Sequence, residues 1–204
     1  MNNQPLIVSY FTENSPYEKE AEDLIASCKK FGLEYQIEKI PDQGSWSKNV
    51  CFKPDFLLAC LEKYNRPLIW TDIDSFFFQN PQILLDCKAD VALRINDTVA
   101  ADSNQKILAN TMYIGNTAPS KKLLNFWKKE CEKILKKDEL AYDQVGLRRV
   151  ILHYPTMVEI KRLPMTYFTA TDTPEEKDMF PDNAVVVHYK LSRLYANQKE
   201  LASV

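Results

Sequence analysis

The sequence predicts an α/β protein with a mostly parallel central sheet. Three consecutive segments support this prediction: an apolar strand at residues 6–11, an amphipathic helix at residues 15–31 and an alternating strand at residues 33–40. A strand, a helix and a second strand in this order are typical of parallel sheets with right-handed crossovers. Ligands of such open sheets bind beyond the carboxyl ends of the strands. We therefore expect a functional site at that edge.

The first helix has recognisable start and stop signals. It is expected to begin at a capping box, Ser15-Pro16-Tyr17-Glu18, with proline at the first helical position. Gly32 is expected to end it, because glycine tolerates the backbone conformation that closes a helix. Its apolar residues recur at helical spacing and form one face, made up of Ala21, Leu24, Ile25, Cys28 and Phe31.

The later elements alternate between strands and helices. Residues 41–49 are predicted to form a polar loop. The later strands are expected at residues 68–70, 90–95, 109–115 and 184–188, and the later helices at residues 52–64, 81–85, 119–136 and 140–152. The chain between the last helix and the last strand is expected to be irregular.

The bulk composition fits one globular domain, which we place at residues 1–204. Hydrophobic residues make up 45% of the 204 residues, and the formal net charge is −2. A nucleic-acid-binding protein would carry a basic excess, so this charge argues against that class. The first residues contain no positive region and no long apolar segment. We therefore expect no signal peptide and no transmembrane segment.

The five cysteines are widely spaced, and no pair has the spacing of a zinc finger. Cys28, Cys60 and Cys131 fall on the apolar faces of predicted helices. Buried thiols of this kind are typical of proteins in a reducing compartment. We therefore expect a cytoplasmic protein.

Two aspartates follow the apolar run from Leu68 to Trp70, which is predicted to be a strand buried on both faces. Asp72 and Asp74 stand two positions apart, and because side chains alternate along a strand we expect both on one face. Adjacent carboxylates repel each other unless a cation lies between them. Mn²⁺ and Mg²⁺ are held by such carboxylates together with substrate phosphates. The sequence therefore predicts a site for one of these dications.

This segment resembles the DxD motif of the GT-A nucleotide-sugar glycosyltransferases. As in that family, an apolar strand leads into the aspartate pair, and aromatic residues and Asn80-Pro81 follow it here. The resemblance covers most of the chain in order. It implies a GT-A type, Rossmann-like three-layer sandwich and a hexosyltransferase-like enzyme that moves a sugar from a nucleoside-diphosphate sugar to a hydroxyl of a glycan or another acceptor. UDP is favoured over GDP because more of these enzymes use it. Asp74 would bind the metal, and Asp72 would share it or accept a hydrogen bond from the donor's ribose.

A second part of the resemblance lies near the end of the chain. Residues 187–190 resemble the element with which these enzymes return a late histidine to the metal and a lysine to the diphosphate. The resemblance implies that His188 is a metal ligand and that Lys190 contacts the diphosphate, with Arg193 beside it. Neutral imidazole is a suitable ligand for Mn²⁺, and a cation there would offset the charge of the leaving diphosphate.

The remaining donor-site residues are also implied by the resemblance. Tyr10 and Thr12, at the end of the first strand, would contact the nucleotide base, and Lys53 would lie near the donor. Asn110 would face the sugar. Asp143 opens the helix below the acceptor site, where it would act as the general base on the acceptor hydroxyl or bind a hydroxyl of the donor sugar.

Two alternatives remain open. A haloacid dehalogenase-like phosphohydrolase would use Asp72 as nucleophile and Asp74 as acid, but such folds usually carry threonine where Phe76 stands here, and they place the motif on the first strand. A non-catalytic nucleotide-sugar binding module would not need the aspartate pair, His188 and Asp143 together. The sequence does not identify the sugar, the acceptor, the stereochemical outcome or the oligomeric state.

Overall fold

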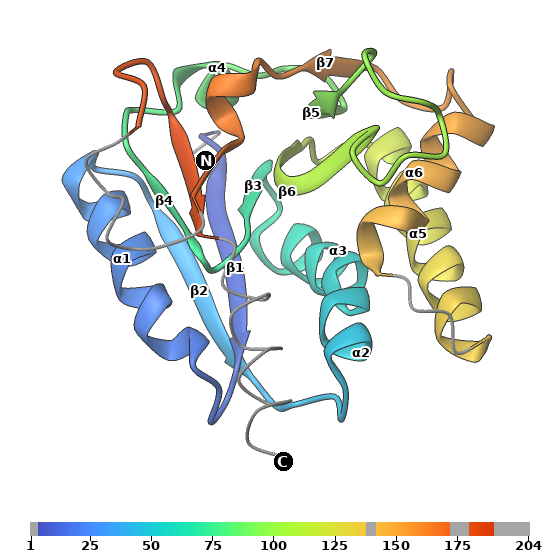
Figure 1. Cartoon of the computed structure of the whole chain (residues 1–204), viewed down its shortest axis with the longest axis horizontal. Helices are drawn as coiled ribbons and strands as arrows, with labels where there is room; N and C mark the ends of the chain where they lie inside the picture. Colours follow the sequence, from blue (N-terminus) through green and yellow to red (C-terminus); the bar gives the residue numbers. More distant parts are fainter. Residues whose placement is uncertain (1–3, 138–141, 172–179, 190–204) are drawn as a thin grey trace.

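A computed structural model describes residues 4–137, 142–171 and 180–189 of the protein (Figure 1). Within these residues, six strands form the central sheet in the order β2-β1-β3-β6-β5-β7. Their bounds are β1 Leu6–Thr12, β2 Tyr35–Ile40, β3 Leu68–Thr71, β5 Val91–Ile95, β6 Ile107–Ile114 and β7 Ile160–Arg162. β6 pairs antiparallel with both β3 and β5, whereas the β1–β2, β1–β3 and β5–β7 pairs are parallel. The sheet is therefore mostly parallel, as predicted.

Helices cover both faces of this sheet, which makes the fold a three-layer sandwich (Figure 1). Alternate residues of β1 mark the two faces, because Val8 packs with α3, α5 and α6 whereas Ile7 packs with α1 and α4. The helices are α1 Tyr17–Lys30, α2 Trp46–Cys51, α3 Lys53–Tyr64, α4 Gln82–Leu85, α5 Ala118–Lys136 and α6 Asp143–His153. The predicted GT-A type fold class is confirmed.

A second, smaller sheet packs on the α1 side. It contains β4 Ser75–Phe77, β8 Thr169–Thr171 and β9 Val186–Tyr189 in the order β4-β9-β8. In Figure 1 its last strand runs beside the label of β4, on the same side of the central sheet as α1. β4 follows the aspartate pair directly, so this sheet brings the late histidine strand to the end of β3.

Three local predictions are wrong. The capping box does not form, because Ser15 Oγ donates to the carbonyl of Thr12 and α1 starts one residue after Pro16 without a side-chain cap. The predicted polar loop contains α2, whose cap is Ser45. The segment expected to be irregular contains β7, the 3₁₀ turn η1 Met165–Tyr167 and β8. These are short elements, which depend on tertiary pairing more than on local sequence pattern.

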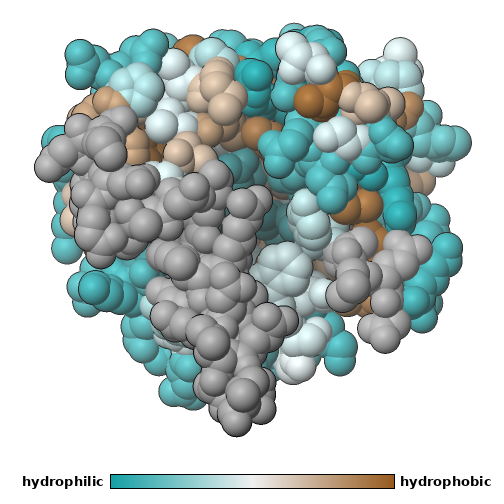
Figure 2. Space-filling view, in the orientation of Figure 1, coloured by the Kyte–Doolittle hydropathy of each residue, from teal (hydrophilic) through white to brown (hydrophobic). Residues whose placement is uncertain are grey.

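The surface agrees with the composition. Outside the grey atoms, the face turned to the viewer in Figure 2 is mostly hydrophilic, with hydrophobic residues in small separate groups. Among the described residues, no helix has the length and apolar character needed to cross a membrane.

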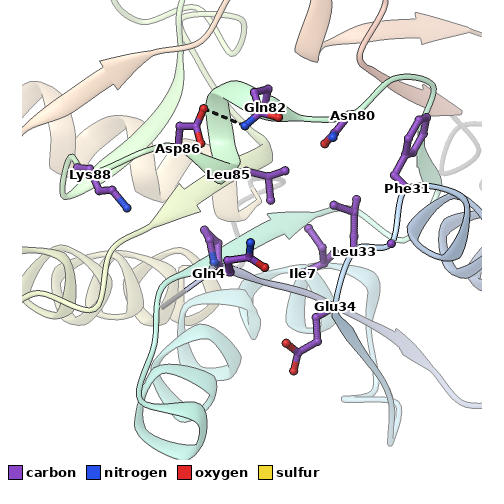
Figure 3. Close-up of a pocket in the computed structure, with 12 residues that line it drawn as sticks. Gln4, Ile7, Phe31, Leu33, Glu34, Asn80, Gln82, Leu85, Asp86 and Lys88 are labelled. Atoms are coloured by element: carbon purple, nitrogen blue, oxygen red, sulfur yellow. Dashed lines mark hydrogen bonds between the residues drawn. The ribbon is translucent and has the colours of Figure 1, made fainter. Parts of the chain in front are cut away.

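A cavity of about 480 Å³ lies at the amino-terminal edge of the sheet, lined by residues from the start of β1, from the segment 31–34 between α1 and β2, and from α4 and the residues around it. Figure 3 shows Ile7, Leu33 and Leu85 around it, and Gln82 donates a hydrogen bond to Asp86 at its rim. This is the edge opposite the carboxyl ends of β1 and β3, so the cavity is separate from the predicted site.

Candidate active site

Three predicted site residues from distant parts of the chain meet at the carboxyl edge of the sheet. Lys53 opens α3, Asp72 follows β3 and Asp143 opens α6. The Lys53 Nζ lies 3.0 Å from Asp72 Oδ1 and 2.7 Å from Asp143 Oδ2, and it donates to the Ala109 carbonyl at 3.4 Å. One ammonium group therefore links two carboxylates and the neighbouring strand β6.

The Lys53 ammonium is buried but fully compensated. The side chains of Lys53 and Asp143 are 6% and 7% exposed, whereas that of Asp72 is 34% exposed. Burial alone would lower the pKa of Lys53, but the charges of Asp143 and Asp72 outweigh it and raise this pKa above its ordinary value. The Nζ also lies 4.9 Å from the ring centroid of Trp70, a cation–π distance. Lys53 therefore stays charged and is held by its partners.

Asp72 has a further donor that sequence reasoning missed. The Trp70 Nε1 donates to Asp72 Oδ1 at 2.9 Å, and the Asp72 backbone N–H donates to the Asn110 carbonyl at 2.9 Å. Asp72 lies just beyond the end of β3, so strand alternation alone did not reveal this contact from the sequence. Asp72 is thus fixed by an ammonium and an indole.

Asp143 is positioned from α5. The Trp127 Nε1 donates to the Asp143 carbonyl at 2.7 Å, and Trp127 itself is fully buried. A Cβ at Gly146 would lie 3.3 Å from Trp127 Cδ1, so glycine allows α6 to approach α5 this closely. Burial raises the pKa of Asp143 above its ordinary value, although Lys53 acts in the opposite direction. Sequence reasoning placed Asp143 at a helix start but did not find its anchor.

Neither Asp72 nor Asp74 lies within a strand. β3 ends at Thr71 and β4 begins at Ser75, so both aspartates lie on the short connection between them, and the strand-alternation argument for their common face is wrong. The two carboxylates still interact, because burial and then the charge of Asp72 raise the pKa of Asp74 to about 8. The Asp74 carbonyl accepts from the Tyr189 N–H at 2.7 Å, which ties this connection to β9.

His188 lies beside this connection, opposite Ser75 in the β4–β9 pair. Its Nδ1 is 2.6 Å from Ser75 Oγ, and its Nε2 is 3.1 Å from Thr111 Oγ1. Burial lowers the pKa of His188 to about 4, so the imidazole is neutral at pH 7. Both ring nitrogens therefore have hydroxyl neighbours.

Several observations bear on the fit of a dication. The Asp72 and Asp74 carboxylates suit one, since each is a hard oxygen donor and their repulsion would be relieved by a cation. The Oδ1 of Asn110, whose backbone accepts from Asp72, is buried and has no hydrogen-bond partner among the described residues. However, no three His, Cys, Asp or Glu side chains in the described part of the chain are grouped to hold a metal. The two aspartates fit, and His188 as a third ligand stays a prediction.

The residues predicted to contact the base lie at the end of β1. The Tyr10 ring packs against Phe52, Phe56 and Trp70, and its hydroxyl donates to the Asn49 carbonyl at 2.6 Å. These are the contacts of a core residue. Contact with the nucleotide base stays a prediction for both Tyr10 and the half-buried Thr12. Lys190 and Arg193 lie outside the described residues.

Comparisons with known proteins identify the family and the fold of the chain. The family model for nucleotide-diphospho-sugar transferases matches residues 23–200. Among solved structures, the protein is similar to a glycosyltransferase involved in the glycosylation of the major capsid of PBCV-1, with a TM-score of 0.64, 14% sequence identity and coverage of 98% of each chain. At this identity the likeness shows the fold alone. None of the curated proteins compared matches the sequence. Because the family match spans most of its length, the chain belongs to the nucleotide-diphospho-sugar transferases and is a glycosyltransferase.

Proposed function

We propose that this glycosyltransferase transfers a sugar from a UDP-sugar to an acceptor hydroxyl with the help of Mn²⁺ or Mg²⁺. The observation that carries the proposal is the cluster of Lys53, Asp72 and Asp143 at the carboxyl edge of the sheet, with Asp74 beside it. This is the edge where open sheets of this class bind their ligands. The family supplies the nucleotide-sugar chemistry, and the cluster supplies charged groups suited to its diphosphate and hydroxyls.

Asp72 and Asp74 would hold the dication, and His188 would join them if its Nε2 exchanged the Thr111 hydroxyl for the ion. When bound, the ion would act as a Lewis acid on the departing diphosphate. Lys53 keeps Asp72 in place, because its ammonium is 3.0 Å from Asp72 Oδ1 and is itself almost fully buried. Lys53 was predicted to lie near the donor, and its contacts support an indirect role through the two aspartates.

In the transfer step, the acceptor oxygen bonds to the anomeric carbon while the bond from that carbon to the diphosphate breaks. The acceptor hydroxyl must lose a proton, and Asp143 is the proposed base. Burial raises its pKa above the ordinary value of a carboxyl group, which makes it a stronger proton acceptor. The alternative role for Asp143 is to bind a hydroxyl of the donor sugar. The Oδ1 of Asn110, which has no hydrogen-bond partner within the described residues, is suited to accept from a hydroxyl of the donor.

The rest of the donor would contact residues outside this cluster. Tyr10 and Thr12 are proposed for the base, and Lys190 and Arg193 for the diphosphate. We also propose a cytoplasmic location. All five cysteines are free and buried, an arrangement suited to a reducing compartment.

A nucleotide-release assay tests the proposal. The protein is incubated with UDP-sugars and GDP-sugars, with and without Mn²⁺, in the absence of an acceptor. Water should slowly replace the acceptor, so free UDP and free sugar should appear only with Mn²⁺. Release of GDP alone would overturn the choice of nucleotide, and release that is equal without Mn²⁺ would overturn the role of the metal. Release of inorganic phosphate would contradict the transferase reading itself.

A further inference from the structure

One tryptophan differs from the other two in its exposure. Trp46 is 50% exposed, whereas Trp70 and Trp127 are 2% and 0% exposed. Trp70 and Trp127 have defined tasks, since their indole N–H groups fix Asp72 and Asp143. An indole that leaves half of its surface in water gains little from burial, so its position calls for another explanation.

Local hydrogen bonds fix the segment that carries Trp46. Trp46 is the first residue of α2, and Ser45 Oγ caps that helix by accepting from the Lys48 N–H at 3.2 Å. The Asn49 side chain accepts from the Gln43 N–H at 2.8 Å and donates to Asp42 Oδ1 at 2.9 Å. The indole is therefore presented from a locally hydrogen-bonded turn and helix.

The exposed ring lies on the Asp143 side of the candidate active site. Its centroid is 5.8 Å from that of Tyr142, in an edge-to-face arrangement. Tyr142 directly precedes Asp143, whose carboxylate is 2.7 Å from the Lys53 ammonium. Asp72, one of the two aspartates that would hold the metal, contacts the same Lys53 ammonium at 3.0 Å. The aromatic pair is thus placed next to the group proposed to receive the acceptor's proton.

We propose that Trp46, together with Tyr142, forms a stacking surface for a pyranose ring of the acceptor. This inference rests on the proposed function. A pyranose presents a face of C–H groups, whose slight positive polarity suits the negative face of an aromatic ring. Stacking needs no charge and leaves the sugar's hydroxyl groups free at the ring edge. One of these hydroxyls could then reach Asp143 while the ring rests on Trp46.

Acceptor probes test this surface directly. Methyl α- and β-pyranosides of glucose, galactose, mannose and N-acetylglucosamine are added to the protein with Mn²⁺ and the donor that supports nucleotide release. The expected result is that at least one glycoside accelerates release. Its KM should rise about tenfold in Trp46→Ala, as truncation of an aromatic anchor commonly weakens binding. Trp46→Phe keeps a ring and should restore most of the affinity.

Two controls separate this role from general damage. Tyr154→Ala removes another exposed aromatic side chain, 41% exposed, at the far end of α6 from Asp143, and should leave the glycoside KM unchanged. Nucleotide release into water should also be unchanged in Trp46→Ala, because the proposed surface binds the acceptor and this reaction uses none. In a separate readout, the glycoside should change the tryptophan emission of the wild type but not of Trp46→Phe.

The outcomes distinguish this inference from the proposed function. Absence of nucleotide release from the wild type contradicts the proposed function. With release intact, the stacking surface is contradicted by three results: no response to any glycoside, an equal KM in wild type and Trp46→Ala, or a loss of UDP affinity in Trp46→Ala. The last result would assign the indole to the nucleotide base instead.

Discussion

Asp72 and Asp74 stand two residues apart but lie in opposite electrostatic surroundings. Asp72 has the Lys53 ammonium at 3.0 Å and the Trp70 indole N–H at 2.9 Å. Asp74 forms no ion pair with a lysine or arginine in the described part of the chain, and burial together with the charge of Asp72 raises its pKa to about 8. Among the described residues, a lysine therefore neutralises Asp72, and no lysine or arginine forms such a pair with Asp74.

The difference also separates two halves of the site. On the Lys53 side, Asp72 and Asp143 belong to a buried ionic network whose members are already paired. On the β4–β9 side, the imidazole of His188 has the Ser75 and Thr111 hydroxyls as neighbours, and Asp74 has the charge of Asp72 nearby. A cation that binds between Asp72 and Asp74 would relieve the repulsion of their carboxylates, and its effect should be largest on Asp74.

The largest expected effect concerns Asp143, at the outer end of the paired half. Asp143→Asn should lower the turnover of transfer by about 10²–10⁴-fold if this carboxylate takes the acceptor's proton. UDP affinity should be unchanged, since the Lys53–Asp72 pair remains. Steady-state kinetics and a UDP titration check both. Asp55→Asn, which removes a more exposed partner of Lys128, is the control. If Asp143→Asn and Asp55→Asn have equal turnover, Asp143 is an ion-pair partner of Lys53 and not the base.

Lys53 is the cation that pairs with both Asp72 and Asp143. Lys53→Met leaves Asp143 buried without a partner, so the free energy of unfolding should fall by about 3–5 kcal/mol. Lys128→Met removes a half-exposed ion pair and should change it by no more than ~1 kcal/mol. Urea denaturation of the metal-free proteins measures both values. Combining Lys53→Met with Asp143→Asn should restore part of the loss. Equal effects of the two lysine substitutions would mean that the network does not stabilise the fold.

A smaller effect is expected at Thr111, whose hydroxyl lies beside the His188 ring. Thr111→Val keeps the shape but removes the hydroxyl 3.1 Å from His188 Nε2, and should lower stability by about 1 kcal/mol without metal. If Nε2 is a metal ligand, the freed nitrogen can bind the ion, so the loss should shrink when Mn²⁺ is added. Thermal unfolding with and without Mn²⁺ measures this. A loss that is the same in both conditions would assign His188 a structural role.

Much of the fold could be predicted because long periodic segments determine it. The early strand–helix–strand unit, the buried strand before Asp72 and the amphipathic α5 all carry patterns that match one face of the core. The second sheet could not be predicted in full. β8 spans only Thr169–Thr171, and it exists because β9 pairs with it in parallel, a contact that no local pattern encodes.

For the candidate site, the sequence indicated individual residues but not the contacts between them. Lys53, Asp72 and Asp143 were each proposed separately, and the structure brings them to one point. Their linkage through a single ammonium was not predicted, because a lysine at a helix start usually faces solvent and nothing in the sequence shows that it is buried. The shared face of Asp72 and Asp74 was argued from strand periodicity, which fails where the strand ends at Thr71.

Calorimetric titration of UDP, with and without Mn²⁺, tests whether Asp74 is a ligand of the bound dication. The wild type should bind UDP more tightly with Mn²⁺. Asp74→Asn should lose this Mn²⁺-dependent gain in UDP affinity. The loss should exceed the roughly 10–100-fold that is typical when an outer-shell partner of a metal site is removed. Without metal, the unfolding midpoint of Asp74→Asn should stay at or above that of the wild type. An Mn²⁺-dependent gain that survives in Asp74→Asn would contradict the account.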